Sequence, residues 1–187
     1  MSYRLLTAIR LPDIIKKYAC GKPILVFCFT RASCAQTAET LVDLWDSQTR
    51  NNKPWSSPTK TIKVQHEKSQ QLIPSGVAIH HGGMSAEDRR IIERAYLEGQ
   101  INVICCTSTL AVGVNLPCHT VIIKGTVAFE DGGRRLQELS DLEIFQMIGR
   151  AGRPQFDDSA VAVIMTRMGK TDHFKKLVTG QEYLESK

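Results

Sequence analysis

The sequence predicts an α/β domain with a mainly parallel sheet flanked by helices. Short runs rich in Val and Ile alternate with longer segments of helical periodicity, a pattern typical of chains that build parallel sheets through strand, helix, strand crossovers. The runs are apolar throughout, so both faces of their strands must be covered, and helices are expected to cover them. With 187 residues, 42% hydrophobic and 23% charged, the composition is that of one soluble globular domain, and we assign residues 1–187 to it.

Five runs are predicted as strands, at residues 24–29, 76–80, 102–106, 120–124 and 160–165. Three helices are expected between them, at residues 33–45, 85–97 and about 141–149, with a further short helix within residues 59–72. In the second of these, Ser85 is the expected N-cap and Asp88 an acidic partner for the first turn. Pro74 is expected to end the short helix before the next strand begins.

Two stretches interrupt the alternation of strands and helices. Residues 47–58 are rich in Asn, Ser and Pro, so we expect a polar, mobile surface insertion there. Residues 130–135 (Glu-Asp-Gly-Gly-Arg-Arg) predict a flexible charged turn after a strand.

Composition excludes several classes of protein. The six cysteines form no C-x-x-C pair, so we expect no metal site, and those in Val- and Ile-rich segments should be buried free thiols. No apolar run approaches the roughly 20 residues that span a bilayer. The N-terminus has no signal-peptide cleavage pattern, which favours the cytosol or nucleus. A net charge of +5 permits an anionic partner but does not identify one.

The strongest local signal is the segment 146–154 (Gln-Met-Ile-Gly-Arg-Ala-Gly-Arg-Pro). Gly149 and Gly152 are expected to let the backbone turn tightly, while Arg150 and Arg153 can direct two guanidinium groups the same way. Such a pair suits a phosphate chain, because a planar guanidinium spreads its donors over phosphoryl oxygens. From spacing alone, a solvated arginine pair beside a helix stop remains an equal alternative.

A second signal is the segment 107–117, which follows a predicted strand directly and begins with three hydroxyl residues. Ligands of open parallel sheets bind beyond the carboxyl ends of the strands, where hydroxyl and backbone N–H groups can hold phosphates. An ordinary helix N-cap closed by Pro117 would explain the same residues. Thr30 and Arg31 follow another strand, although a Thr-Arg pair there is commonplace.

The adjacent residues His80 and His81 suggest metal or acid–base chemistry, which we discount. Neighbouring side chains at a strand end point in opposite directions, and the sequence offers no third ligand nearby. One of the two can face a binding surface.

Together these segments resemble the second RecA-like lobe of superfamily 2 helicases, in the superkiller-type branch of DExH-box enzymes. Residues 25–31 are similar to motif IV, residues 80–84 to the His-His-Ala-Gly-Leu box, residues 107–117 to motif V and residues 146–154 to motif VI. The resemblance covers nearly the whole chain. Residues 155–157 and 160–167 look closest to the meiotic crossover-promoting DNA helicases.

This resemblance implies a RecA-like, three-layer fold and a role for each motif. It makes Gln146, Arg150 and Arg153 the expected catalytic residues, with the arginines reaching the γ-phosphate of ATP as arginine fingers. It places Gly113 and Asn115 toward the nucleotide. It assigns Thr30, Arg31, Thr107, Ser108 and Thr109 to the sugar-phosphate backbone of the bound strand.

The resemblance also implies partners that the sequence does not contain. No G-x-x-x-x-G-K-[ST] loop and no Asp-Glu-x-His box occur in these residues, so the first RecA-like lobe is absent. ATP and Mg²⁺ are therefore expected to be held mainly by that lobe in a longer polypeptide, and none is expected on this chain alone. The expected substrate is single-stranded nucleic acid, DNA favoured over RNA, in a nuclear 3′–5′ helicase of meiotic recombination or repair, with no membrane partner.

Three other functions stay open on sequence grounds. Residues 120–126 are shared with the splicing members of the branch, so an RNA helicase lobe is one alternative. A nucleic-acid-binding module without ATPase activity is another. A complete small phosphate-binding enzyme is the third, and it lacks a nucleophile and base to run its chemistry.

Overall fold

A six-stranded parallel sheet forms the centre of the molecule in the computed structural model, which describes residues 2–6, 10–129, 136–152 and 160–179. Along the chain its strands are β1 (Ser2–Leu6), β2 (Ile24–Phe27), β3 (Val77–His80), β4 (Val103–Cys106), β5 (Thr120–Lys124) and β8 (Val161–Met165). Their order in the sheet is β1-β8-β5-β2-β4-β3. The five predicted strands are thus confirmed, each within two residues at either end, because long Val- and Ile-rich runs buried on both faces have no helical alternative.

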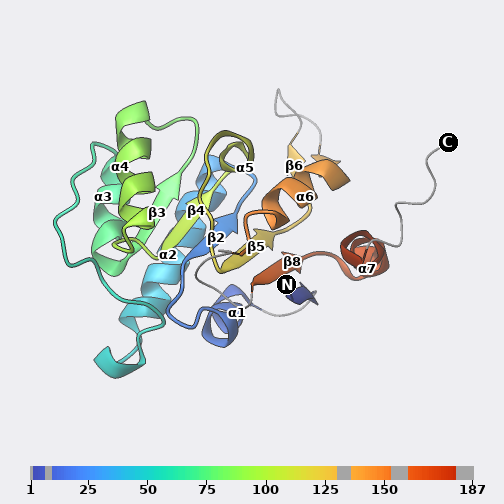
Figure 1. Cartoon of the computed structure of the whole chain (residues 1–187), viewed down its shortest axis with the longest axis horizontal. Coiled ribbons are helices and arrows are strands. Elements are labelled where there is room, and N and C mark those ends of the chain that lie inside the picture. Colours follow the sequence, from blue (N-terminus) through green and yellow to red (C-terminus); the bar gives the residue numbers. More distant parts are fainter. Residues whose placement is uncertain (1, 7–9, 130–135, 153–159, 180–187) are drawn as a thin grey trace.

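Helices flank this sheet as expected. They are α1 (Leu11–Tyr18), α2 (Arg31–Asp46), α3 (Glu67–Leu72), α4 (Ala86–Leu97), α5 (Thr109–Gly113), α6 (Asp141–Ile148) and α7 (Thr171–Thr179), with short 3₁₀ turns η1 (Arg50–Asn52), η2 (Ile73–Ser75) and η3 (Met168–Lys170). Helix α2 packs on β3 and β4 and also contacts α1 and α3, whereas α4 packs on β3, and α6 on β5. Right-handed crossovers place α2 and α4 on opposite faces, which gives the three-layer α/β architecture. Figure 1 shows α3 and α4 beside β3 at one end of the sheet and α7 beyond β8 at the other.

The core lies between the sheet and its helices. Every residue of β2, β3 and β4 is buried, and the side chains of Ile24, Leu25, Val26 and Phe27 have no measurable exposure. Burying one such side chain is worth about 1.5–3 kcal/mol relative to leaving it exposed. This apolar sheet therefore fixes where the polar loops at its ends can lie.

The segment 47–58 lies largely at the surface, as expected of a polar insertion, but one of its side chains is an anchor that was not predicted. Trp55 lies within it and is only 2% exposed, with its Nε1 donating to the carbonyl of Ser75 at 2.7 Å. Trp45 Nε1 in turn donates to the Trp55 carbonyl at 3.0 Å. Gly76, in the left-handed region at φ 73°, leaves no room for a Cβ beside the Trp55 ring and the Ser56 carbonyl. The many Asn, Ser and Pro residues of this segment gave no indication of the anchor, because a single aromatic side chain can bury a large apolar area among polar neighbours.

Besides β1, α1 and α7, two further features were not predicted. An antiparallel hairpin of β6 (Val127–Phe129) and β7 (Leu136–Glu138) follows β5, and the predicted charged turn 130–135 between its strands lies outside the described residues.

Asp88 lies in the first turn of α4 as expected, and Ser85 caps this helix. The Asp88 carboxylate, however, accepts from the backbone N–H groups of Gln65 and His66, at 2.8 and 3.0 Å. It therefore anchors the loop before α3 to α4.

Candidate functional site

The predicted site residues gather at one edge of the sheet. The strands β2 and β4 are hydrogen-bonded neighbours with Phe27 opposite Cys106, so the segments that follow them leave the sheet side by side. The N–H of Cys28 donates to the Cys106 carbonyl at 2.7 Å, so the two chain segments are still hydrogen-bonded where the strands end. The carboxyl ends of parallel strands meet at this edge, which is where such sheets bind ligands.

Thr30 and Arg31 have different surroundings. Thr30 is the N-cap of α2, and its hydroxyl accepts from the Ser33 N–H at 2.9 Å. This structural role is one that sequence reasoning did not assign to it. Arg31 is exposed and its guanidinium lies over Gly83, where a Cβ would come within 2.6 Å of Nη1. Gly83 thus permits Arg31 to cross to the loop after β3.

The three hydroxyl residues after β4 are held beside β3. The Thr107 N–H donates to the His80 carbonyl at 3.3 Å, and the hydroxyls of Thr107 and Thr109 lie 2.9 Å apart. Ser108 occupies the N-cap position of α5, but its side chain makes no cap hydrogen bond. The N-cap alternative therefore does not account for Ser108, whose hydroxyl is available to a ligand.

The arginine-bearing loop follows α6, a helix that begins at Ser140 with a capping box completed by Glu143. Such a box satisfies two backbone donors reciprocally and fixes where the helix starts. Gly149 was expected in a tight turn but keeps helical dihedrals instead (φ −60°). Its lack of a side chain matters for packing, because a Cβ at this position would lie 3.2 Å from the Phe145 carbonyl. Gly152 does adopt a positive φ of 111°, as a tight turn requires.

Backbone contacts fasten this loop to the entry of β5. The Cys118 N–H donates to the Arg150 carbonyl at 3.0 Å, and the Gly152 N–H donates to the Cys118 carbonyl at 2.7 Å. The half-buried Arg150 side chain donates through Nη2 to the carbonyl of Ala111 in α5. Arg150 thereby joins the segment 146–154 to the segment 107–117, a link that spacing along the chain does not reveal.

A cavity of about 350 Å³ lies between α5 and α6. It is lined by Ser108, Thr109, Ala111, Gly113, Glu143, Gln146 and Met147. The structure thus brings together four predicted site residues from two motifs that are far apart in sequence. Sequence reasoning missed Glu143, although its place one turn before Gln146 on α6 puts both on one helix face.

Other predicted residues lie apart from this cavity. Asn115 is exposed on the segment after α5 and does not line it, and Thr30 and Arg31 stand at the end of β2. Arg153 lies outside the described residues. The prediction for Arg153 therefore stays a prediction.

The two histidines at the end of β3, His80 within the strand and His81 directly after it, are both largely buried, at 2% and 7% exposure. His80 Nε2 lies 2.7 Å from a carboxylate oxygen of Glu93, and burial lowers the pKa of His80 despite that carboxylate. Burial also lowers the pKa of His81, helped by the nearby charges of His66 and Arg31, and its Nδ1 accepts from the Gly83 N–H at 3.2 Å. The neutral form of each ring is thus favoured over what its usual pKa would give, and neither ring presents a broad binding surface.

The cysteines behave as buried thiols. Five of the six are buried, and burial raises the pKa of Cys105 and Cys106 well above its usual value. A hydrogen bond from Cys34 lowers the pKa of Cys28 to about 7, against the burial that raises it. Within the described ranges, no three His, Cys, Asp or Glu side chains are grouped as a metal ion would require.

No helix in the described part of the chain is long and apolar enough to cross a membrane.

Comparison with known proteins gives a consistent result. Residues 7–155 match the family described as helicase conserved C-terminal domain. The chain is 44% identical over 181 residues to the ATP-dependent DNA helicase MER3 of Saccharomyces cerevisiae, covering 95% of this chain and 14% of that protein. It is 38% identical to the MER3 homologue of Arabidopsis thaliana (93% and 16%) and 36% identical to activating signal cointegrator 1 complex subunit 3 of Bos taurus (93% and 8%). The chain thus spans less than a fifth of the length of these relatives.

Proposed function

The chain belongs to the helicase conserved C-terminal domain family, and from this premise we propose that it is the second motor lobe of an ATP-dependent DNA helicase. The observation that carries the proposal is the cavity between α5 and α6, where Gln146 meets Ser108, Thr109 and Gly113. A motor must couple a nucleotide to a strand. In this cavity, residues of the motif expected to bind the strand lie against residues of the motif expected to bind the nucleotide.

ATP would lie against the side of the lobe that carries α6 and the loop after it. Arg150 and Arg153 would face the γ-phosphate, with Gln146 positioning the phosphate or the attacking water, and Gly113 and Asn115 toward the nucleotide. The exposed Gly113 supports this, since its lack of a side chain leaves the backbone open to close approach. The donors of Gln146 and Arg150 suit phosphate oxygens, whereas the Glu143 carboxylate suits a hydroxyl donor of the ligand.

When bound, Mg²⁺ neutralises charge on the phosphates. The described residues do not group carboxylates that could hold it, so we propose that the first RecA-like lobe of the same polypeptide holds Mg²⁺ and most of the ATP. The contribution of this chain would be positively charged side chains that act when the two lobes close.

The strand would run along the carboxyl edge of the sheet. Thr30, Arg31, Thr107, Ser108 and Thr109 would contact its sugar-phosphate backbone. Such contacts carry little base information, so the preference for DNA over RNA rests on the names of the MER3 relatives. From the resemblance of residues 155–157 and 160–167 to the meiotic crossover-promoting DNA helicases, we propose a nuclear role in meiotic recombination or repair and 3′–5′ movement.

The test is DNA-stimulated ATP hydrolysis and unwinding by the full-length protein that carries this chain. We expect single-stranded DNA to stimulate phosphate release, and duplexes with a 3′ single-stranded tail to be unwound in preference to those with a 5′ tail. Stimulation by RNA but not DNA would assign the lobe to an RNA helicase of the splicing type. Strand binding without hydrolysis would make the protein a binding module and contradict the proposal.

A further inference from the structure

A second cavity, of about 330 Å³, lies at the carboxyl ends of β5 and β8. It is lined by Lys124, Gly125, Thr126, Val127, Met165, Thr166 and Arg167, none of which lies in the four motif segments 25–31, 80–84, 107–117 and 146–154. The strand β5 pairs with β2, with Ile123 opposite Phe27, and β8 pairs with β5. The cavity therefore continues the same edge of the sheet that carries Thr30 and Thr107.

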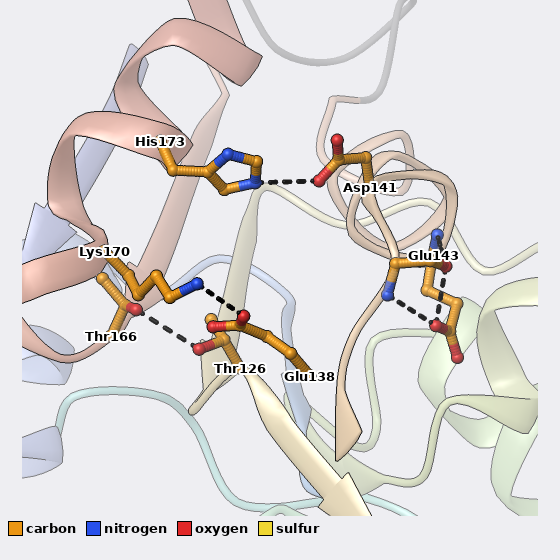
Figure 2. Close-up of polar contacts among 8 residues, drawn as sticks. Thr126, Glu138, Asp141, Glu143, Thr166, Lys170 and His173 are labelled. Carbon is orange, nitrogen blue, oxygen red and sulfur yellow. Dashed lines mark hydrogen bonds and ion pairs between the residues drawn. The ribbon is translucent and has the colours of Figure 1, made fainter.

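The lining of this cavity is suited to an anion. Lys124 and Arg167 supply two positive charges, and none of the described lining residues carries a carboxylate. Glu138, on the hairpin that begins after Thr126, is already paired with Lys170 at 2.8 Å (Figure 2). Arg167 is exposed and forms no ion pair with the residues that the structure describes.

The polar groups of the cavity are held in place before any ligand arrives. Lys124 Nζ donates to the hydroxyl of the fully buried Thr37 at 2.8 Å, which fixes the ammonium group and leaves its other hydrogens free. The hydroxyls of Thr126 and Thr166, 3% and 8% exposed by residue, lie 3.2 Å apart (Figure 2). Each hydroxyl carries one hydrogen, so the partner that accepts within the pair keeps its own hydrogen for a ligand.

An aromatic side chain borders the same place. A Cβ at Gly125, whose φ is 110°, would lie 3.4 Å from the half-buried Phe29 ring, so the glycine brings the ring beside the cavity. Nucleic-acid tracks commonly combine positive charge for the backbone with aromatic rings for the bases. A strand of nucleic acid fits this combination better than an isolated phosphate does.

We propose that this cavity binds a phosphate of the nucleic-acid backbone, through Lys124, Arg167 and the Thr126–Thr166 hydroxyl pair. The inference rests on the proposed function and extends it, because it adds β5 and β8 to a strand track that the known motifs confine to β2 and β4. Neighbouring strands are about 4.8 Å apart, so β8 carries the track about 10 Å beyond β2.

The experiment measures binding of a fluorescent single-stranded DNA to the full-length protein by anisotropy, at several salt concentrations. We expect Arg167→Gln and Lys124→Gln each to weaken binding several-fold at low salt. Each should also reduce the slope of log K against log salt by about 0.7, the value for one lost phosphate contact. Arg167→Lys keeps the charge and should retain the slope. Circular dichroism and thermal melting check that each variant is folded.

Two control variants separate the possible outcomes. Arg94→Gln removes an exposed arginine from α4, away from the cavity, so an effect of Arg167→Gln no larger than this one would overturn the inference. Thr109→Ala probes the motif track. If it weakens binding while Lys124→Gln and Arg167→Gln do not, the cavity inference fails and the proposed function stands. If the protein binds no single strand at all, both fail. Reduced ADP affinity with unchanged strand affinity would assign the phosphate to a nucleotide and also overturn the inference.

Discussion

At the residue scale, the side chain of Arg150 makes one contact within the fold and is proposed to make another with the nucleotide. Its Nη2 donates to the carbonyl of Ala111, so part of the guanidinium is committed to holding α5. A guanidinium has five N–H donors in a planar fork, which leaves others for phosphate oxygens. With the proposed contact to the γ-phosphate, Arg150 would connect the nucleotide to the segment expected to hold the strand.

We predict that Arg150→Ala and Arg153→Ala in the full-length helicase lower kcat for ATP hydrolysis by orders of magnitude, with a modest change in nucleotide Kd. A group that meets the γ-phosphate mainly in the closed state stabilises the transition state more than the ground state. Steady-state phosphate release and nucleotide titration measure the two quantities.

A lysine variant tests whether positive charge alone is sufficient at Arg150. Arg150→Lys should leave the Ala111 carbonyl poorly bound and rescue neither the rate nor its coupling to DNA, because lysine lacks the planar fork. A near-normal kcat in both alanine variants would show that neither arginine acts on the γ-phosphate.

His80 gives a pH-dependent prediction. Burial lowers its pKa in the folded protein, so the unfolded chain binds a proton more readily as pH falls below about 6.5. The free energy of unfolding should therefore decrease as the pH is lowered from 7.5 to 5.5. For a domain of this size, each loss of about 1 kcal/mol lowers Tm by about 2–4 °C. Melting curves across this range measure it. His80→Gln, which cannot titrate, should flatten the curve, and an equally steep curve in that variant would exclude His80 as the cause.

At the scale of elements, the segment 47–58 shows how one side chain ties a loop to the sheet. The Trp55 ring fills the space that Gly76 leaves open, and its indole N–H donates to the Ser75 carbonyl. Both contacts sit directly before β3, the strand whose carboxyl end leads to His81 and Gly83. The insertion thus stabilises a strand that serves the site.

We predict that Trp55→Ala lowers the free energy of unfolding by about 3–5 kcal/mol, the usual cost of emptying a buried Trp site. Trp55→Phe keeps most of the apolar contact and loses the hydrogen bond to Ser75, so about 1–3 kcal/mol is expected. Urea denaturation of both variants checks the order. A loss below 1 kcal/mol for Trp55→Ala would show that the segment is not anchored by this ring.

The sequence was informative where one physical force dominated. Fully apolar runs predicted the central strands, and the positions of Thr30 and Thr107 after two of these runs predicted that each would lie beyond the carboxyl end of a strand. Helix α1 was missed although Pro12 in its first turn and the spacing of Leu11, Ile14 and Ile15 are start and face signals. The three-residue strands β6 and β7 are too short for any periodicity to show.

The site itself was only partly predictable. The motif residues follow from type and position, but the lining of the cavity by Glu143 and the bond from Arg150 to Ala111 depend on how α5 and α6 pack. A polar insertion was expected at residues 47–58, but its anchoring through Trp55 was not. Long-range packing, not local composition, decided each of these.

At the scale of the whole molecule, the lobe presents donors and positive charge along one edge of its sheet but carries no phosphate-binding loop in its 187 residues. We predict that the isolated chain folds and hydrolyses no ATP above background, with or without DNA. Steady-state phosphate release measures this, with Arg150→Ala of the same chain as the control for contaminating ATPases. DNA-stimulated turnover that disappears in that control would refute the half-motor proposal.

The pairing of β1 with β8 has a consequence for synthesis. Ser2 lies opposite Val161 and Leu6 opposite Met165, so β1, the earliest of the six described strands of this sheet along the chain, must wait for β8 before it has this partner. At about 5–20 residues per second, a ribosome needs roughly ten seconds or more to supply that partner. During this interval β5, β2, β4 and β3 can assemble among themselves, while the unpaired β1 segment offers its backbone to other chains. The sheet of this lobe is therefore completed only when β1 and β8 pair.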